Sequence, residues 1–315
     1  MKKIFTALKE GILVLWFVKA IRFILSLIPY KLRITVVTIP IRIFIALSPK
    51  YRHIAHKNLQ LVFPDKDDAW RNDIIKKHCR VLANMLVDFF RLPFLDFDWV
   101  EKNVDFKAKE LLCSVDKRCG DKGFLCLTGH LSSFELIPMI FSSVGCPVSI
   151  VVRNLKPKLL DEWWNQCRSV HDCGVMSRNG AVRTMIKRIK DDKEVGILFD
   201  QNVTRNNAIF VDWFGRPAAT TPAFGQLALK LKTPVVVFEI QTKGDGHYYV
   251  RGEEVKTDDL MDNSEVPFEE GVRIITERAV KIMERYIKES PENWFWFHKR
   301  WRTTPNEGDP ENFYK

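Results

Sequence analysis

Apolar positions recur with a helical period in the first part of the chain and in a mixed pattern after it. From Asp73 to Phe90 the apolar residues have helical spacing, and Pro93 closes that segment. From Phe124 onward come short apolar runs typical of buried strands, namely FLCLTG (124–129), VSIVVR (148–153), EVGILFD (194–200), VVVFEI (235–240) and HYYVRG (247–252). Helical patterns separate them at 181–190, at 223–232 after a Thr-Pro pair, and at 268–287. The alternation predicts an α/β fold with a central, mostly parallel sheet flanked by helices.

The N-terminal segment is the most apolar part of the chain. Gly11–Ile28 is mostly apolar and is interrupted by Lys19 and Arg22, and a helix of this length reaches about 27 Å, barely enough to cross a bilayer core. A second apolar stretch, Ile34–Leu47, is broken by Pro40. Three interpretations stay open: a span, a shallow helix whose cations reach the headgroups, and a helix buried against the protein's own core. We expect membrane attachment through an N-terminal apolar membrane helix.

Three parts follow from these patterns. Residues 1–50 are expected to form a membrane-associated helical segment, and residues 51–110 a helical, membrane-proximal part. Residues 111–315 are expected to form the α/β catalytic domain. The chain shows no internal repeat and no Gly/Ser-rich linker between these parts.

Composition adds a preference for acidic partners. The formal net charge is +10, which suits nucleic acid, an anionic lipid surface, or an acidic carrier or substrate. The nine Trp residues and an aromatic content of 12% indicate a folded protein. Nucleic acid is suggested by charge alone, because the sequence has no zinc-finger spacing, RNP-like run or basic heptad region, and we predict no nucleic-acid partner.

The seven Cys residues are odd in number and scattered, which suits a reducing compartment better than a disulfide framework. A zinc site is the competing interpretation, with Cys167, His171 and Cys173, or His53 and His56, as ligands. Neither group has the paired C-x2-C spacing of a structural zinc site, and we predict no metal ion and no cofactor.

The segment GHLSSFEL (129–136) has two interpretations. His130 and Glu135 have the spacing of an acid–base pair, whereas Ser132 and Glu135 have that of a helix capping box. On an ideal helix, residues i and i+5 point about 140° apart, so His130 and Glu135 meet only if the helix starts near Ser132 or Ser133. A neutral His oriented by a carboxylate is then a general base that can deprotonate an alcohol. Backbone N–H groups at the helix start would stabilise the oxyanion formed on a thioester.

Two basic features surround this segment. Several Arg residues follow strands and could hold a phosphorylated ligand, or could be ordinary solvated side chains. They are Arg153, Arg178, Arg183, Arg205 and Arg216. Near the C-terminus, WFWFHKRWR (294–302) is typical either of an interfacial aromatic belt or of an amphipathic core strand with Trp294, Trp296 and His298 on one side.

Five blocks in the same order resemble the bacterial lipid A late acyltransferases, the lauroyl and myristoyl transferase family within the His-x4-Asp/Glu acyltransferases. They cover residues 124 to 304. The blocks are GHLSSFEL, VVRNLKPKLLDEWWNQCRSVHDCGVMSRNGAVRTMIKRIK, EVGILFDQN, IFVDWFGRPAATTPAFGQLALKLKTPVV and PENWFWFHKRWRT. The resemblance implies a glycerolipid acyltransferase-like fold.

The resemblance also implies an enzyme of the bacterial inner membrane, with its catalytic domain on the cytoplasmic face. It would move a fatty acyl chain from acyl carrier protein to a hydroxyl of a lipid A precursor, an anionic glycolipid. His130 would be the general base and Glu135 its orienting partner. Arg153, with Arg178, Arg183 and Arg216, would bind anionic groups, and Asp200 with Gln201 would shape the site.

Four questions stay open at this point. Coenzyme A is the competing acyl donor, and the length of the acyl chain is undetermined. A glycerophospholipid or another glycolipid is the competing acceptor, because that group of enzymes uses the same His-x4-acid logic. A membrane-binding protein without activity is the alternative from a different class, and the intact His130 and Glu135 pair argues against it.

Overall fold

The computed structural model describes residues 2–178, 180–242, 244–261, 263–306 and 312–314. The α-helices are α1 (Lys2–Ser26), α2 (Tyr30–Ala46), α3 (Pro49–Val62), α4 (Asp68–Arg91), α5 (Phe97–Asn103), α6 (Lys109–Cys119), α7 (Ile137–Ser142), α8 (Lys158–Arg168), α9 (Ala181–Lys190), α10 (Ala223–Leu231), α11 (Asp258–Met261) and α12 (Phe268–Glu289). The strands are β1 (Val104–Phe106), β2 (Leu125–Thr128), β3 (Val148–Val152), β4 (Gly174–Ser177), β5 (Glu194–Leu198), β6 (Ile209–Trp213), β7 (Arg216–Thr220), β8 (Val235–Thr242) and β9 (Tyr248–Glu254).

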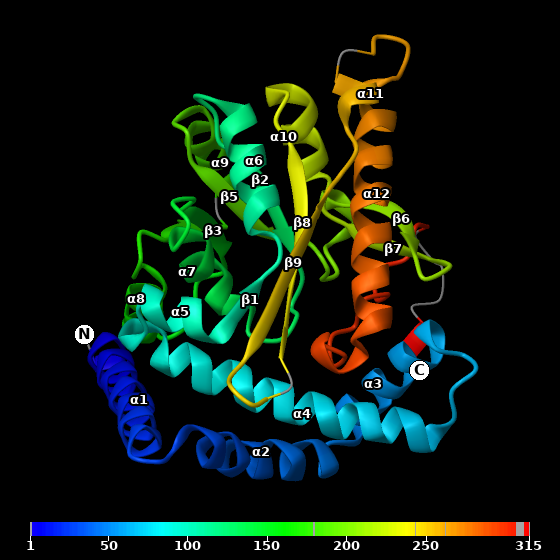
Figure 1. Ribbon diagram of the computed structural model, residues 1–315. Coiled ribbons are helices and arrows are strands. Elements are labelled where there is room, and N and C mark those ends of the chain that lie inside the picture. The colour runs from blue at the N-terminus through cyan, green and yellow to red at the C-terminus, as the bar shows by residue number, and fades with distance from the viewer. Residues whose placement is uncertain (1, 179, 243, 262, 307–311, 315) are drawn as a thin grey trace.

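A seven-stranded sheet lies at the centre of the molecule in the order β1-β9-β8-β2-β5-β3-β4 (Figure 1). All neighbouring strands are parallel except β8 and β9, which form an antiparallel pair. A separate antiparallel hairpin, β6–β7, packs beside α12. The predicted α/β fold with a mostly parallel sheet is confirmed.

Side chains on the two faces of the sheet enter different apolar clusters, as the twofold alternation of a strand requires. On β2, Leu125 and Leu127 pack in the cluster that includes α9, α10 and α12. Cys126 points the other way, into the cluster of α6 and α7. Both faces are covered, which explains why the central strands are apolar throughout instead of alternating.

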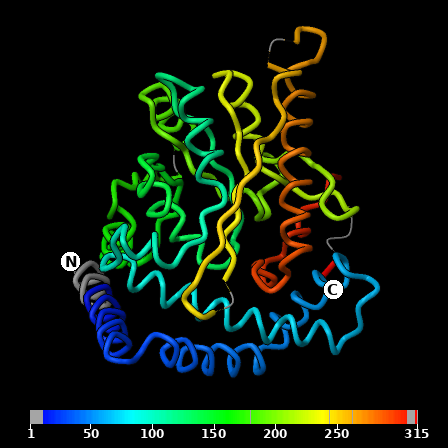
Figure 2. The backbone as a smooth tube through the Cα atoms, viewed as in Figure 1, coloured from blue at the N-terminus to red at the C-terminus, as the bar shows by residue number. Residues whose placement is uncertain are grey.

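The N-terminal helices form a layer below the sheet (Figures 1 and 2). The long helix α4 runs beneath the sheet, α2 packs against α4, and α1 packs against α8. One side of α1 joins an apolar cluster with α4 and α8, in which Leu25 is buried and Arg22 lies 4.3 Å from the ring centroid of Phe94. The other side carries exposed apolar side chains, including Trp16 and Phe17.

The predicted N-terminal membrane helix is a helix in the structure. Taken singly, the helices within the described part of the chain are each too short or too polar to cross a membrane, although α2 and α3 together, bent by 92° at their junction, meet the length and hydropathy criteria.

Three features of the fold were not predicted from the pattern. Strand β4 is short and half-exposed, and β1 joins the sheet edge from a segment that was expected to be helical. The hairpin β6–β7 lies within the block IFVDWFGRPAAT, where Phe214 and Gly215 have positive φ and turn the chain. The division into three parts stays a prediction.

Candidate active site

His130 and Asp200 meet because their strands are neighbours. Strands β2 and β5 are parallel, and Thr128 on β2 lies beside Leu198 on β5. The residues two positions after these, His130 and Asp200, therefore leave the same edge of the sheet together. This is the edge where the carboxyl ends of parallel strands collect reactive groups. The two side chains are joined by a hydrogen bond of 2.8 Å between His130 Nδ1 and Asp200 Oδ1.

Asp200 is held as a buried anion. Its Oδ2 accepts from the His130 backbone N–H and from the Trp294 indole, each at 2.8 Å. Burial alone would raise the pKa of Asp200, but the His130 ring and these two donors outweigh it and lower the pKa to about 2. Gly129 permits the approach, because a Cβ at this position would lie 3.1 Å from the Asp200 carboxyl.

The charge of Asp200 decides the tautomer of His130. An ionised carboxylate only accepts hydrogen bonds, so Nδ1 carries the proton and Nε2 keeps its lone pair. The His130 ring lines a large cavity, and its side chain is 27% exposed. Phe134 packs edge-on against the ring, with 5.1 Å between centroids. The arrangement is that of a general base whose orientation is set by a buried carboxylate.

Glu135 has a different partner from the one predicted. Both of its carboxylate oxygens accept from Arg168 at the end of α8, with Nη2 at 2.5 Å and Nε at 2.9 Å. The prediction that Glu135 orients His130 is corrected: Asp200 does so. The reason is directional, because Glu135 points from the first turn of its helix toward α8, while the Nδ1 side of His130 faces the end of β5.

The helix start within GHLSSFEL lies where the spacing predicted it. A short 3-10 helix, η2 (Phe134–Leu136), begins after Ser133 and runs into α7. The predicted capping box of Ser132 and Glu135 does not form: no side chain of the described residues caps η2, and both carboxylate oxygens of Glu135 accept from Arg168. Ser132 has a φ of 47°, in the left-handed region, and this bends the chain sharply between His130 and the helix.

The cavity beside His130 has a volume of about 1470 Å³, above the usual range for small-molecule pockets. Its walls come from both faces of the sheet. One set of lining residues belongs to the α6 and α7 side, and includes Cys126, Ile137, Val148 and Phe238. The other belongs to the α9 and α12 side, and includes Ala181, Met185 and Ile197. Apolar walls of this extent fit hydrocarbon chains better than a small polar substrate.

Only some of the predicted binding residues line the cavity. Arg153, Arg178 and Gln201 line the cavity, and both Arg side chains are exposed. Arg183 lies exposed in the first turn of α9, outside the described lining of the cavity. Arg216 lies on β7, where its guanidinium is 4.5 Å from the Phe313 ring centroid.

Arg205, the remaining Arg of the predicted set, anchors the C-terminal segment. Its Nε donates to the Thr304 backbone carbonyl at 3.1 Å, and Nη2 donates to the Asn306 carbonyl at 2.9 Å. These two contacts give the side chain a structural role.

The aromatic C-terminal segment is core, so the interfacial-belt interpretation of WFWFHKRWR is wrong. Trp294, Trp296 and Trp301 are buried beneath the site, and Arg300 is fully buried with its guanidinium 4.6 Å from the Trp213 ring centroid. The segment is not a ladder strand either. An isolated bridge pairs Trp294 with Leu131.

Three functional candidates were missed in the sequence, namely Arg168, Trp294 as a donor to Asp200, and His298. His298 lines the cavity and accepts the Asn202 backbone N–H at 2.9 Å, and burial lowers its pKa to about 4. Local spacing carries no signal for these contacts, because each joins segments that are tens of residues apart. Within the described residues, no group of three or more His, Cys, Asp or Glu side chains is placed to hold a metal ion.

A profile of the family described as bacterial lipid A biosynthesis acyltransferase matches residues 1–303. The chain belongs to that family. It is 23% identical over 265 residues to the lipid A biosynthesis myristoyltransferase of Escherichia coli K12, covering 84% of this chain and 79% of the relative. It is 23% identical to lipid A biosynthesis acyltransferase 2 of Shigella flexneri over 94% of this chain and 92% of that one. The lipid A biosynthesis lauroyltransferase of Escherichia coli K12 is 24% identical over 82% of this chain and 81% of its own.

Membership makes the chain an acyltransferase and gives the cavity a context. The large cavity and the oriented His130 beside it are the features of this acyltransferase that a mechanism has to use.

Proposed function

We propose that this acyltransferase moves a fatty acyl chain from acyl carrier protein to a hydroxyl of a lipid A precursor. The single observation that carries the proposal is the His130–Asp200 pair, bonded at 2.8 Å, with the His130 ring lining a large, mostly apolar cavity. The acceptor follows from the names of the relatives, which are lipid A myristoyl, lauroyl and palmitoleoyl transferases.

In the proposed step, His130 Nε2 takes the proton of the acceptor hydroxyl while the hydroxyl oxygen attacks the thioester carbonyl carbon. The new C–O bond forms, the C–S bond breaks, and the leaving thiolate recovers the proton from His130. Asp200 stabilises the imidazolium that exists between these events. The step consumes a thioester and an alcohol and releases an ester and a thiol, and it needs no cofactor.

Glu135 and Arg168 have a supporting part in this proposal. Their ion pair lines the same cavity as His130, and the two side chains are 9% and 16% exposed. A bidentate pair fixes the orientation of a guanidinium. In this proposal the positive charge of Arg168 helps to stabilise the oxygen that develops negative charge.

Anionic groups of donor and acceptor would meet the cavity mouth. Arg153 and Arg178 are exposed there, and the net charge of the whole chain is +10. A guanidinium binds phosphate with two parallel hydrogen bonds, which suits a phosphorylated glycolipid. The same positive field favours encounter with an acidic carrier protein.

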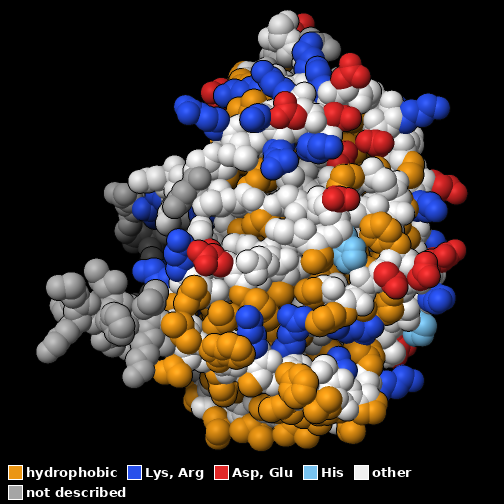
Figure 3. Space-filling view, turned by 90° about the vertical axis from the view of Figure 1, so that its left-hand side faces the viewer, with side chains coloured by type: hydrophobic (Ala, Val, Ile, Leu, Met, Phe, Trp, Pro, Cys, Tyr) orange, Lys and Arg blue, Asp and Glu red, His pale blue; other side chains and the backbone are white. Residues whose placement is uncertain are grey.

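Attachment to the inner membrane would occur through the exposed apolar side of α1 and α2. Hydrophobic side chains gather over the lower end of the molecule, with Lys and Arg side chains above them (Figure 3). Leu27 at the corner between the two helices is 70% exposed, and Leu47 after α2 is 78% exposed. An apolar patch of this kind bordered by cations is typical of a surface that inserts shallowly into anionic lipid. Docking on the cytoplasmic face would place the cavity next to newly made precursor.

The test of the reaction uses purified full-length protein in lipid vesicles, with radiolabelled acyl carrier protein thioester and a lipid A precursor that has a free hydroxyl. We expect transfer by the wild type and by His247→Gln, which changes an exposed histidine outside the described lining of the cavity. His130→Gln should reduce turnover by about 10³-fold or more without lowering the melting temperature by more than a few degrees. Normal turnover by His130→Gln would refute the base. Acyl-coenzyme A and a lysophospholipid as alternative substrates decide the donor and the acceptor.

Membrane attachment has its own test by flotation with anionic vesicles. Trp16→Glu and Phe17→Glu place a charge on exposed apolar positions of α1 and should reduce the bound fraction several-fold. Lys109→Gln on α6 changes the net charge by the same −1 at an exposed site on another face, and should leave binding unchanged. Equal losses in the three variants would mean that net charge, and not this surface, governs attachment.

A further inference from the structure

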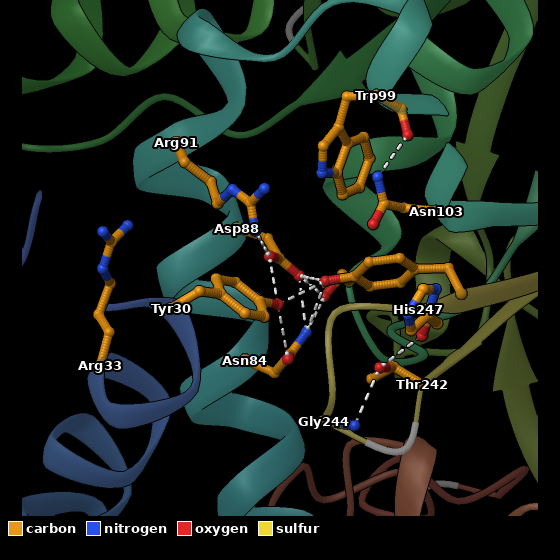
Figure 4. Close-up of polar contacts among 12 residues, drawn as sticks. Tyr30, Arg33, Asn84, Asp88, Arg91, Trp99, Asn103, Thr242, Gly244 and His247 are labelled. Carbon is orange, nitrogen blue, oxygen red and sulfur yellow. Dashed lines mark hydrogen bonds and ion pairs between the residues drawn. The ribbon is translucent and has the colours of Figure 1, made fainter. Parts of the chain in front are cut away.

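A buried polar cluster surrounds Asp88 (Figure 4), and a hydrogen bond to Ser133 joins it to the loop that carries His130. We call it the Asp88 network. Its members come from four regions far apart in the sequence, namely Tyr30 at the start of α2, Asn84 and Asp88 on α4, Ser133 before η2, and Tyr248 on β9. Asn84, Asp88 and Ser133 are fully buried, and Tyr248 is 3% exposed. A polar cluster this deep needs an explanation, since buried polar groups cost free energy unless every one is paired.

Asp88 is the acceptor at the centre of this network. Its Oδ2 accepts from Ser133 Oγ at 2.5 Å, Tyr248 OH at 2.5 Å and Asn84 Nδ2 at 2.6 Å. Its Oδ1 accepts from Tyr30 OH at 3.0 Å. Ser133 Oγ in turn accepts from Asn84 Nδ2 at 3.0 Å, so this hydroxyl is fixed both as donor and as acceptor.

Tyr30 and Tyr248 remain hydrogen-bond donors because burial raises the pKa of both phenols and keeps them protonated. Opposing effects act on the pKa of the Asp88 carboxyl. Burial raises the pKa of Asp88 to about 6, although Ser133 and Tyr248, together with the cation of Arg91 and the Tyr30 hydroxyl, pull the pKa down. A simple packing role would be served as well by apolar side chains of the same volume. The position of Ser133 indicates what the carboxyl is for.

Ser133 lies three residues after His130 and two before Glu135, next to the left-handed Ser132. Such a backbone persists only where its surroundings hold it on both sides. The upstream side is held by the C-terminal segment, with Phe295 N–H donating to His130 O at 3.1 Å and Ser132 N–H donating to Asn293 O at 2.8 Å. The downstream side is held at Ser133 by Asp88.

We propose that Asp88 is a positioning residue for acyl transfer. Through Ser133 it holds residues 130–135 in the conformation that presents His130 and Glu135 to the cavity. Through Tyr30 it ties that loop to the corner between α1 and α2, whose neighbour Leu27 is exposed. The inference rests on the proposed role of His130 as base.

The test compares full-length Asp88→Asn and Ser133→Ala with wild type. Neither residue lies among those lining the described cavity, so a positioning role predicts a lower kcat with little change in KM. We expect kcat to fall about tenfold or more in each, with KM for donor and acceptor within about twofold. Deuterium exchange of the peptide covering 129–136 should become faster in both variants.

Glu239→Gln is the matched control, because Glu239 is also a fully buried carboxylate, bonded to Arg251 and Gln241 on β8 and β9. It should lose thermal stability to a similar degree while kcat and loop exchange stay at wild-type values. A kcat for Ser133→Ala within twofold of wild type, in a folded protein, overturns the proposal. So does an equal loss of kcat in Glu239→Gln.

Tyr30→Phe tests the link to α2, since it removes one hydroxyl from the far side of Asp88. It should lower kcat about threefold and speed exchange of the same peptide, and unchanged exchange would overturn that part of the proposal.

Failure of this inference is distinguishable from failure of the proposed function. If His130→Gln is inactive while Asp88→Asn and Ser133→Ala turn over normally, only the positioning role of Asp88 is wrong. If His130→Gln is active, the proposed role of His130 as base is wrong.

Discussion

Asp200→Asn is the most informative single change, because it keeps the shape of the side chain and removes the charge. The carboxyl is 2% exposed and accepts from His130 Nδ1, the His130 backbone and Trp294. Its pKa is lowered from 3.8 to about 2 in the folded protein. At about 1.4 kcal/mol per pKa unit, this corresponds to about 2 kcal/mol of stability at pH 7. Because the folded pKa is the lower one, this contribution is present above pH 4 and is lost as the pH falls toward 2.

The effect on catalysis should be larger than the effect on stability. An amide at position 200 can present its NH2 group to Nδ1, which then has to accept, and the ring proton moves to Nε2. A ring protonated at Nε2 cannot take a proton from the acceptor hydroxyl. We therefore expect kcat to fall roughly 10²- to 10⁴-fold, the range seen when the carboxylate behind a catalytic His is replaced by an amide.

The assay is acyl transfer under saturating donor and acceptor, with the melting temperature measured on the same preparation. Glu239→Gln is again the control for replacing a buried carboxylate by its amide. Turnover of Asp200→Asn within about threefold of wild type would refute the reasoning, because His130 would then be oriented without this carboxylate.

Three further predictions follow from other parts of the site. Arg168→Lys keeps the charge but loses the bidentate contact with Glu135, so it should lower kcat at least tenfold in a folded protein. Arg168→Ala should melt at a clearly lower temperature, because breaking a buried ion pair costs about 3 kcal/mol. If both variants melt and turn over like wild type, the pair has no role. Cys126→Phe fills the α7 side of the cavity and should shorten the longest acyl chain that is accepted, while short chains are transferred at rates within about twofold of wild type. An unchanged chain-length profile would exclude this side of the cavity as the acyl site. Burial lowers the pKa of His78 to about 4, so between pH 6.5 and pH 4 unfolding takes up a proton and the protein loses stability as the pH falls. His78→Phe should reduce the slope of the unfolding free energy against pH by about 1 kcal/mol per pH unit in this window. An unchanged slope would contradict the assignment.

The local pattern of the sequence determined the elements and their order. The runs at 124–129, 148–153, 194–200, 235–240 and 247–252 became β2, β3, β5, β8 and β9, and the pattern at 181–190 became α9. These segments are predictable because apolar spacing reports burial within a single element. His130 was identified for the same reason, since a polar residue directly after a buried strand lies at the sheet edge.

The partner of His130 could not be predicted in this way. Glu135 was favoured because it is five residues away, whereas Asp200 is 70 residues away and reaches His130 only because β2 and β5 are neighbours in register. Strand order is a property of the whole sheet, set by which apolar faces pack together, and no spacing within one segment records it.

The aromatic segment at 294–302 shows the same division. Its alternating Trp and basic residues fit a membrane interface and a protein core equally well, because both environments accept an apolar ring with a polar edge. The sequence by itself determined that the rings would leave water. Only the tertiary structure decided that they lie under the site, where Trp294 binds Asp200, because covering them required segments from the other end of the chain.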